Sequence, residues 1–201
     1  MENDAENRQF GFAAELERLH SMLGVANVGR ALAWKLRQGL IQEREHAAYA
    51  VVRYGPAFFP NDPAFFVLAL MAEAPNAHSF YKILQKKHAT DGGQSGNQKL
   101  RWVFASGFGK LKKEVRDVLD GRFCTLLACD GREALQMQLR SFWLAKILEY
   151  GVAINFDGLY WDLKKWDDAD ERFQIRRRWA ESFYVGNERS QSEKKDEIVE
   201  D

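Results

Sequence analysis

Residues 135–151 read LQMQLRSFWLAKILEYG. Apolar side chains recur here at intervals of three and four residues, which is the spacing that places side chains on one face of an α-helix. These apolar residues are Leu135, Leu139, Phe142, Trp143 and Ile147. Gly151 follows the last periodic position, as is typical of a residue that ends a helix. The stretch therefore predicts a long amphipathic helix with one face in a core.

Helical signals continue on both sides of this stretch. Asn155 has the side chain of an N-cap, and it precedes apolar residues that share one helical side. Those residues are Phe156, Leu159, Leu163 and Trp166. Farther upstream, Pro63 is placed to begin a helix and Pro75 to close the apolar run FFVLALMAEA. Since no run alternates apolar and polar residues long enough for a sheet, the sequence predicts an all-α fold.

The polar stretch HATDGGQSGNQ, residues 88–98, contains three glycines and no bulky apolar residue. We expect it to be a linker loop between two small helical bundles, residues 1–87 and residues 99–185. Residues 186–201 have almost no apolar content, so we expect them to form a disordered acidic and polar tail.

The composition is that of a globular protein, with 46% hydrophobic and 13% aromatic residues and a net charge of zero. The first residues, MEND, are acidic, which is the wrong sign for a targeting peptide. The longest uncharged apolar run, residues 63–72, has about half the length that a membrane span needs. We therefore expect a soluble cytoplasmic protein that does not contact a membrane.

Motifs for metal, cofactor or nucleophile chemistry do not stand out in the sequence. Two cysteines, Cys124 and Cys129, lie far from any histidine, so we expect buried free thiols in a reducing compartment and no zinc site. The linker glycines precede Lys99 but do not match a phosphate-binding loop, which needs Lys directly after Gly and a strand before it. We predict no cofactor and no metal.

An acidic cluster, Asp167, Asp168, Asp170 and Glu171, lies between two predicted helices. Its simpler interpretation is an N-cap with favourable charge at a helix N-terminus. A metal-dependent nuclease using Asp167, Asp168 and Asp170 is the weaker alternative. We predict that the chain is not an enzyme.

Three consecutive arginines, Arg176, Arg177 and Arg178, precede Trp179. At about 100° per residue they cannot share one face of a helix. This geometry predicts Arg176 inside the apolar face, Arg177 at its edge and Arg178 on the solvent side. We expect Arg176 to pair with a carboxylate or a carbonyl, because a buried unpaired guanidinium is costly. Arg178 is expected to be available to a partner.

Positive charge is concentrated in the centre of the chain, where residues 82–122 hold ten Lys and Arg against four Asp and Glu. The cations nearest the linker are Lys82, Lys86, Lys87, Lys99 and Arg101, followed by Lys110, Lys112, Lys113 and Arg116. If the two halves fold back beside the linker, these charges flank a groove that can follow a phosphate backbone. The alternative is that they are solvated faces of ordinary helices.

Residues 154–185, INFDGLYWDLKKWDDADERFQIRRRWAESFYV, resemble the end of the CasB family, the small subunit of the type I-E CRISPR surveillance complex Cascade. The shared pattern is a capped helix ending in an aromatic residue plus Asp, an acidic turn, and a basic helix of the form R-R-W-A-x-x-F. Four earlier segments also resemble the family in order and spacing: VGRALAWKLRQG, DPAFFVLALMAEAPNAH, GNQKLRWVFASG and VRDVLDGRFCTLLACDGREALQMQLR. The resemblance extends from about residue 10 to residue 185.

The resemblance implies two helical bundles joined by the central loop and a non-catalytic role. It implies a position along the belly of Cascade, beside the guide RNA, where the subunit helps to hold the target DNA and the displaced non-target strand. The implied partners are the Cascade backbone and large subunits, a second copy packed head to tail, the guide RNA and the target DNA. The alternative is a helical adaptor that joins proteins without contacting nucleic acid.

The resemblance also carries over individual basic positions. Together with Lys99 and Arg178, they form the predicted nucleic-acid-binding set: Arg37, Lys86, Lys87, Lys99, Arg101, Arg122, Arg140 and Arg178. The chain departs from the family pattern in three ways. Residues 61–69 hold no basic residue, Trp102 occupies a usually small position, and the net charge of zero is low for a subunit that holds DNA.

Overall fold

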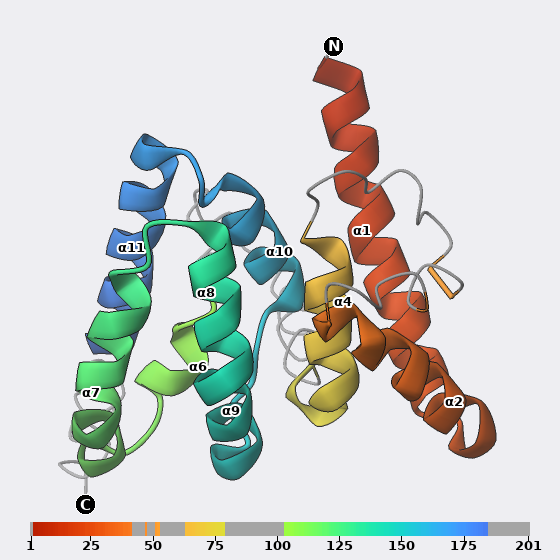
Figure 1. Ribbon diagram of the computed structural model, residues 1–201, viewed down its shortest axis with the longest axis horizontal. Helices are drawn as coiled ribbons and strands as arrows, with labels where there is room; N and C mark the ends of the chain where they lie inside the picture. Colours follow the sequence, from red (N-terminus) through yellow and green to blue (C-terminus); the bar gives the residue numbers. More distant parts are fainter. Residues whose placement is uncertain (1, 42–46, 48–50, 53–62, 79–102, 185–201) are drawn as a thin grey trace, which may run out of the picture.

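The computed structural model describes residues 2–41, 47, 51–52, 63–78 and 103–184 (Figure 1). Every regular element in these ranges is helical, which confirms the predicted all-α class. The predicted linker, residues 88–98, and the predicted tail, residues 186–201, lie outside the described residues. Within the described ranges, no helix combines the length and the apolar character that crossing a membrane requires.

The N-terminal part is formed around one fully apolar helix. Its elements are α1 (Glu2–Leu23), α2 (Ala26–Arg37), the 3₁₀ turn η1 (Gln38–Leu40), α4 (Ala64–Glu73) and the 3₁₀ turn η4 (Pro75–His78). The α4 helix begins after Pro63 and ends before Pro75, as predicted. Its first nine residues are all buried, because the sequence AFFVLALMA has no polar face to turn toward water.

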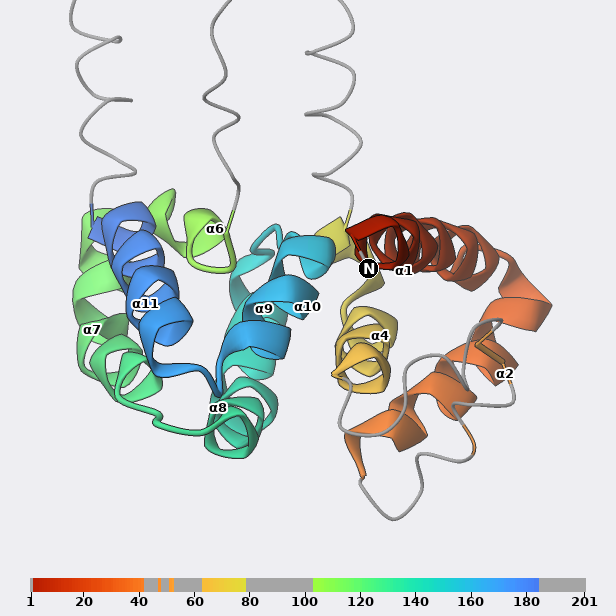
Figure 2. The same ribbon diagram turned by 90° about the horizontal axis from the view of Figure 1, so that it is seen from above.

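The C-terminal part contains the remaining elements. They are α6 (Ser106–Gly109), α7 (Lys113–Leu127), α8 (Arg132–Gln138), the π turn η5 (Leu139–Trp143), α9 (Leu144–Tyr150), α10 (Phe156–Lys165) and α11 (Ala169–Tyr184). Figures 1 and 2 show α6 to α9 and α11 on one side of the molecule and α1, α2 and α4 on the other, with α10 between them.

The long helix predicted from residues 135–151 is present as α8, η5 and α9 in direct succession. Its buried residues lie four apart: Leu135, Leu139, Trp143 and Ile147. A spacing of four overshoots the 3.6-residue α-helical turn, whereas the wider π turn accommodates more residues per turn. The π turn therefore keeps the four side chains on one face. Gly151 ends the helix in the left-handed conformation, with φ 59° and ψ 35°, and the predicted stop is confirmed.

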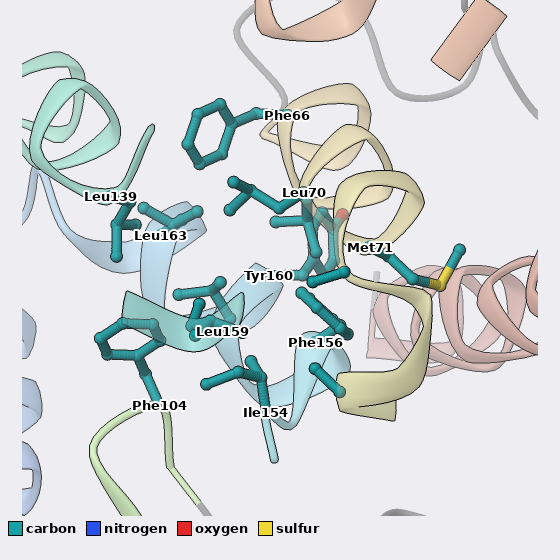
Figure 3. Close-up of a cluster of buried hydrophobic side chains, with 14 of the residues drawn as sticks. Phe66, Leu70, Met71, Phe104, Leu139, Ile154, Phe156, Leu159, Tyr160 and Leu163 are labelled. Atoms are coloured by element: carbon teal, nitrogen blue, oxygen red, sulfur yellow. The ribbon is translucent and has the colours of Figure 1, made fainter. Parts of the chain in front are cut away.

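The α10 helix connects the two parts through the core. Its predicted N-cap is confirmed, since the Asn155 side chain accepts a hydrogen bond from the Gly158 amide at 3.0 Å. Figure 3 shows Phe66 and Leu70 of α4 extending toward Leu163 of α10. The helix packs against α4 and α1.

Two specific contacts reinforce this connection. Tyr160 of α10 stacks on Phe12 of α1, with ring centroids 3.9 Å apart. The Ile154 amide donates to the Ala77 carbonyl at 3.1 Å. The buried side chains of both parts belong to one hydrophobic cluster. The two parts thus meet directly, and their division into two separate bundles stays a prediction.

Two glycines allow the short α6 helix to approach its neighbours closely. A Cβ atom on Gly109 would collide with the carbonyl oxygen of Ser182 in α11, and one on Gly107 would collide with the carbonyl oxygen of Ala153. This approach carries Phe108 into the core, where its ring lies edge-on to Trp143 at 4.7 Å. The two glycines of the sequence SGFG therefore permit the close packing of α6 against its neighbours.

The two cysteines are free, as predicted, but the expected burial is wrong. Cys124 is exposed and Cys129 is half-buried. The reason is helical register: the buried stripe of α7 consists of Leu119, Phe123 and Leu126, and Cys124 is rotated by about 100° from Phe123.

Candidate nucleic-acid interface

Half of the predicted nucleic-acid-binding residues can be placed. Lys86, Lys87, Lys99 and Arg101 lie outside the described residues, as does Lys82, so the groove predicted around the linker stays a prediction. The other four predicted residues come from four different elements, and what each side chain contacts separates them into two groups. They are Arg37, Arg122, Arg140 and Arg178.

Arg37 and Arg140 both lie near the η1 turn, between the two parts of the molecule. Arg37 is the last residue of α2, directly before η1, and its Nε lies 3.1 Å from a carboxylate oxygen of Glu73. Arg140 reaches across from η5 and donates from Nη1 to the Leu40 carbonyl at 2.7 Å. Carbonyls at a helix end lack intrahelical partners, so an arginine is a favourable donor there. Arg140 thus contacts a neutral carbonyl at this turn, whereas Arg37 is paired with a carboxylate.

Arg122 belongs to a cation–aromatic cluster, which we define as Arg122, Phe142, Lys146 and Tyr150. The guanidinium carbon of Arg122 lies 5.2 Å from the centroid of the Phe142 ring. The Lys146 ammonium lies 5.8 Å from the same ring and 5.6 Å from the ring of Tyr150. All three distances are within the range of a cation–π attraction. The cluster connects α7 to the η5–α9 segment and places two cations near the ring of Phe142.

Lys146 differs from Arg122 because it also has a carboxylate partner. Its ammonium donates to Glu149 at 2.5 Å, and this hydrogen bond raises the pKa of Lys146 and lowers the pKa of Glu149. Among the described residues, no carboxylate pairs with Arg122 or Arg140. Within the described ranges, the partners of these two guanidinium groups are thus an aromatic ring and a backbone carbonyl.

Arg178 does not lie on the solvent side, so that part of the sequence prediction is wrong. Its Nη2 donates to Asp162 of α10 at 3.1 Å, and the Asp162 side chain is nearly buried. The other Asp162 oxygen accepts from the indole N–H of Trp179 at 2.7 Å. Arg178 thus serves an ion pair that fastens α11 to α10.

The error comes from the assumed centre of the apolar face of α11. A helical wheel that counts every apolar residue of α11 includes Phe173, which is 63% exposed, and Tyr184, which is 44% exposed, and both displace the centre of the apolar face. The buried residues of α11 are Ile175, Trp179 and Phe183. Their centre lies about 50° from the centre of the wheel that counts every apolar residue. Arg177 then points outward, and its side chain is 66% exposed beside Glu181.

The prediction for Arg176 is confirmed. Its Nη2 donates to the Cys129 carbonyl at 2.9 Å and to an Asp130 carboxylate oxygen at 3.1 Å. The guanidinium also lies 5.8 Å from the ring centroid of Trp166. The arginine run therefore connects α11 to its neighbours at two positions and exposes one charge.

The acidic cluster caps helices, as predicted. One carboxylate oxygen of Asp168 accepts from the amides of Asp170 at 3.0 Å and Glu171 at 2.9 Å, at the start of α11. Asp167 accepts from the Arg132 amide at 2.9 Å, at the start of α8. In the part of the chain that the structure describes, no group of three or more His, Cys, Asp or Glu side chains is arranged to hold a metal ion.

Sequence reasoning missed Lys146 and Tyr150 and assigned Phe142 to the core, although its ring is half-buried. The signal was present in the spacing, since Phe142, Lys146 and Tyr150 follow one another at intervals of four residues. The contact between Phe142 and Arg122 was not visible, because it depends on how α7 packs against η5.

One comparison with known proteins identifies a family. The family model described as CRISPR-associated protein Cse2 matches residues 35–184, which is most of the chain. This is the CasB family predicted from the sequence, and the matched range begins at residue 35 instead of about residue 10. No curated protein and no solved structure matches the chain. The chain belongs to the CRISPR-associated protein Cse2 family, the small subunit of the type I-E Cascade complex.

Proposed function

We propose that this Cascade small subunit contacts nucleic acid directly, without catalysis, and stabilises the target DNA and the displaced non-target strand. The observation that carries the proposal is what the guanidinium groups of Arg122 and Arg140 contact. One guanidinium rests on an aromatic ring and the other on a backbone carbonyl. Both side chains are exposed, so a phosphate can approach them without displacing a carboxylate of the described residues.

The predicted contact residues can be ranked by whether a carboxylate already pairs with them. An arginine that already has a carboxylate partner must exchange one anion for another, and the gain from binding phosphate is correspondingly small. Arg37 is paired with Glu73, and Arg178 is paired with the nearly buried Asp162. Arg122 and Arg140 therefore rank first among the described residues, and Arg178 ranks last because its ion pair supports the fold.

Contacts of this kind suit a subunit that does not read sequence. Phosphate contacts position a protein on a strand but carry no direct base information. In a guide-RNA complex, base pairing with the guide supplies the specificity. The proposed partners are accordingly the guide RNA, the target DNA, the Cascade backbone and large subunits and a second copy arranged head to tail, in the cytoplasm.

The test is a salt titration of DNA binding by reconstituted Cascade carrying Arg122→Gln and Arg140→Gln together. Each lost single-strand phosphate contact reduces the slope of log affinity against log salt by about 0.7, so the double variant should flatten the slope by about 1.4. The matched control is Arg177→Gln, because Arg177 is exposed but paired with Glu181. The control should leave the slope unchanged.

An unchanged slope in the double variant, with normal assembly of the complex, would refute the assignment of these two arginines. It would favour the adaptor alternative, which one observation supports. Large apolar side chains are exposed on the C-terminal helices, among them Val118 of α7 and Met137 of α8. Replacing these two residues should then disturb assembly without changing the slope.

A further inference from the structure

The outer face of α2 carries an exposed aromatic side chain that the proposed function does not yet use. Trp34 is 60% exposed, although tryptophan is usually largely buried. The buried side of the helix consists of Leu32, Ala33 and Leu36. At 100° per residue, Trp34 lies about 150° from the centre of that side. The indole therefore projects away from the core.

Cations flank this ring on both sides. The α2 sequence, ANVGRALAWKLR, contains three basic residues and no acidic one. Arg30 lies one turn before Trp34 on one flank, and Lys35 lies on the other flank; both are exposed. We define the outer face of α2 as Arg30, Trp34 and Lys35. An aromatic plane between positive charges is the arrangement that single-stranded nucleic acid uses, with a base on the ring and phosphates on the cations.

The outer face lies on the helix that leads into the turn contacted by Arg140. The α2 helix leads directly into η1, where Arg140 donates to Leu40. Trp34 lies six residues before Leu40, which corresponds to about 10 Å along the axis. Trp34 precedes the range that the family model matches, residues 35–184. The family match therefore does not include Trp34.

We infer that the outer face of α2 binds single-stranded nucleic acid, with Trp34 stacking on a base and Lys35 contacting an adjoining phosphate. This inference rests on the proposed function, which it extends from charge contacts to a stacking contact. A protein partner is the competing occupant, but the α2 sequence holds basic and no acidic residues, which favours an acidic partner. A nucleic acid strand provides both a π-face and regular negative charge.

The test uses the full chain and an oligo(dT) single strand, with affinity measured by fluorescence anisotropy over a range of salt. Trp34→Leu keeps an apolar side chain and removes the aromatic face, so affinity should fall roughly 5- to 100-fold at each salt concentration while the salt slope stays unchanged. Trp34→Phe should retain most of the affinity. Lys35→Gln should instead reduce the slope by about 0.7.

Folding is controlled by thermal denaturation, and the exposed position of Trp34 predicts an unchanged melting temperature for Trp34→Leu. Wild-type affinity in Trp34→Leu would overturn the inference. If this variant binds DNA normally but fails to assemble into Cascade, the outer face contacts a protein and the inference is also overturned.

The two proposals can fail separately. A flattened slope in the Arg122 and Arg140 double variant, with no effect of Trp34→Leu, leaves the proposed function standing and removes the stacking contact. The reverse result would keep the stacking contact and reject the two arginines.

Discussion

The ion pair between Asp162 and Arg178 should be a major contributor to stability. Asp162 is 6% exposed and accepts hydrogen bonds from the Arg178 guanidinium and the Trp179 indole. Replacing Asp162 with Ala removes both acceptors while leaving both donors in place. Trp179 is fully buried, so its indole N–H would lose its partner without access to water.

The magnitude follows from these two losses. An unsatisfied buried donor costs about 1–3 kcal/mol. Breaking a buried ion pair costs about 3–5 kcal/mol, but the Arg178 side chain is 32% exposed, so water recovers much of that cost. Together the losses lower the free energy of unfolding by about 3 kcal/mol. At about 2–4 °C per kcal/mol for a chain of this size, the melting temperature should fall by about 6–12 °C.

The assay is urea denaturation followed by circular dichroism, combined with a thermal melt. Asp162→Asn keeps an oxygen for the Trp179 indole and should cost about half as much as Asp162→Ala. The matched control is Glu181→Gln, which breaks the exposed pair with Arg177 and should cost less than about 0.5 kcal/mol. If Asp162→Ala is no more destabilising than Glu181→Gln, the reasoning about the buried carboxylate is wrong.

Two further predictions concern backbone packing and pH. Gly109→Ala should destabilise the fold, because the new Cβ meets the backbone of Ser182. Gly121→Ala in α7 has open space around the new Cβ and should stabilise the fold by about 0.5–1 kcal/mol. Chemical denaturation of both variants measures the two changes in the free energy of unfolding. Burial and a hydrogen bond to Asp120 raise the pKa of Tyr184. A raised folded-state pKa stabilises the fold at neutral pH, and this contribution is lost as the pH rises above about 10. Tyr184→Phe should therefore show a smaller alkaline loss of stability than the wild type, and equal losses would contradict the assignment.

Several features of the fold followed from residues close together in the chain. The cap at Asn155 and the helix stop at Gly151 were predicted correctly, because each depends on hydrogen bonds or backbone angles within about one turn. The apolar stripe through Leu135 and Ile147 was correct for the same reason. The order of several such segments also carried the family resemblance, and the family match confirms it.

The predictions that failed concern side chains whose surroundings come from another helix. Arg178 looked free because Asp162, its partner, lies in a different element across the turn between α10 and α11. Cys124 looked buried because the sequence does not state which side of α7 faces the core. An error of about 50° in the centre of the apolar face was enough to assign Arg178, instead of Arg177, to the solvent side.

By itself, the sequence determined the all-α class, the main helix ends described here and the family. The tertiary structure decided which of the described arginines contact a neutral partner and which contact a carboxylate. Arg140 reaches a carbonyl 100 positions away in the chain, and Arg122 lies over a ring carried by another helix. The physical reason is range: periodicity and capping act within a turn, whereas the partner of a long cationic side chain is set by the packing of helices that are distant in sequence.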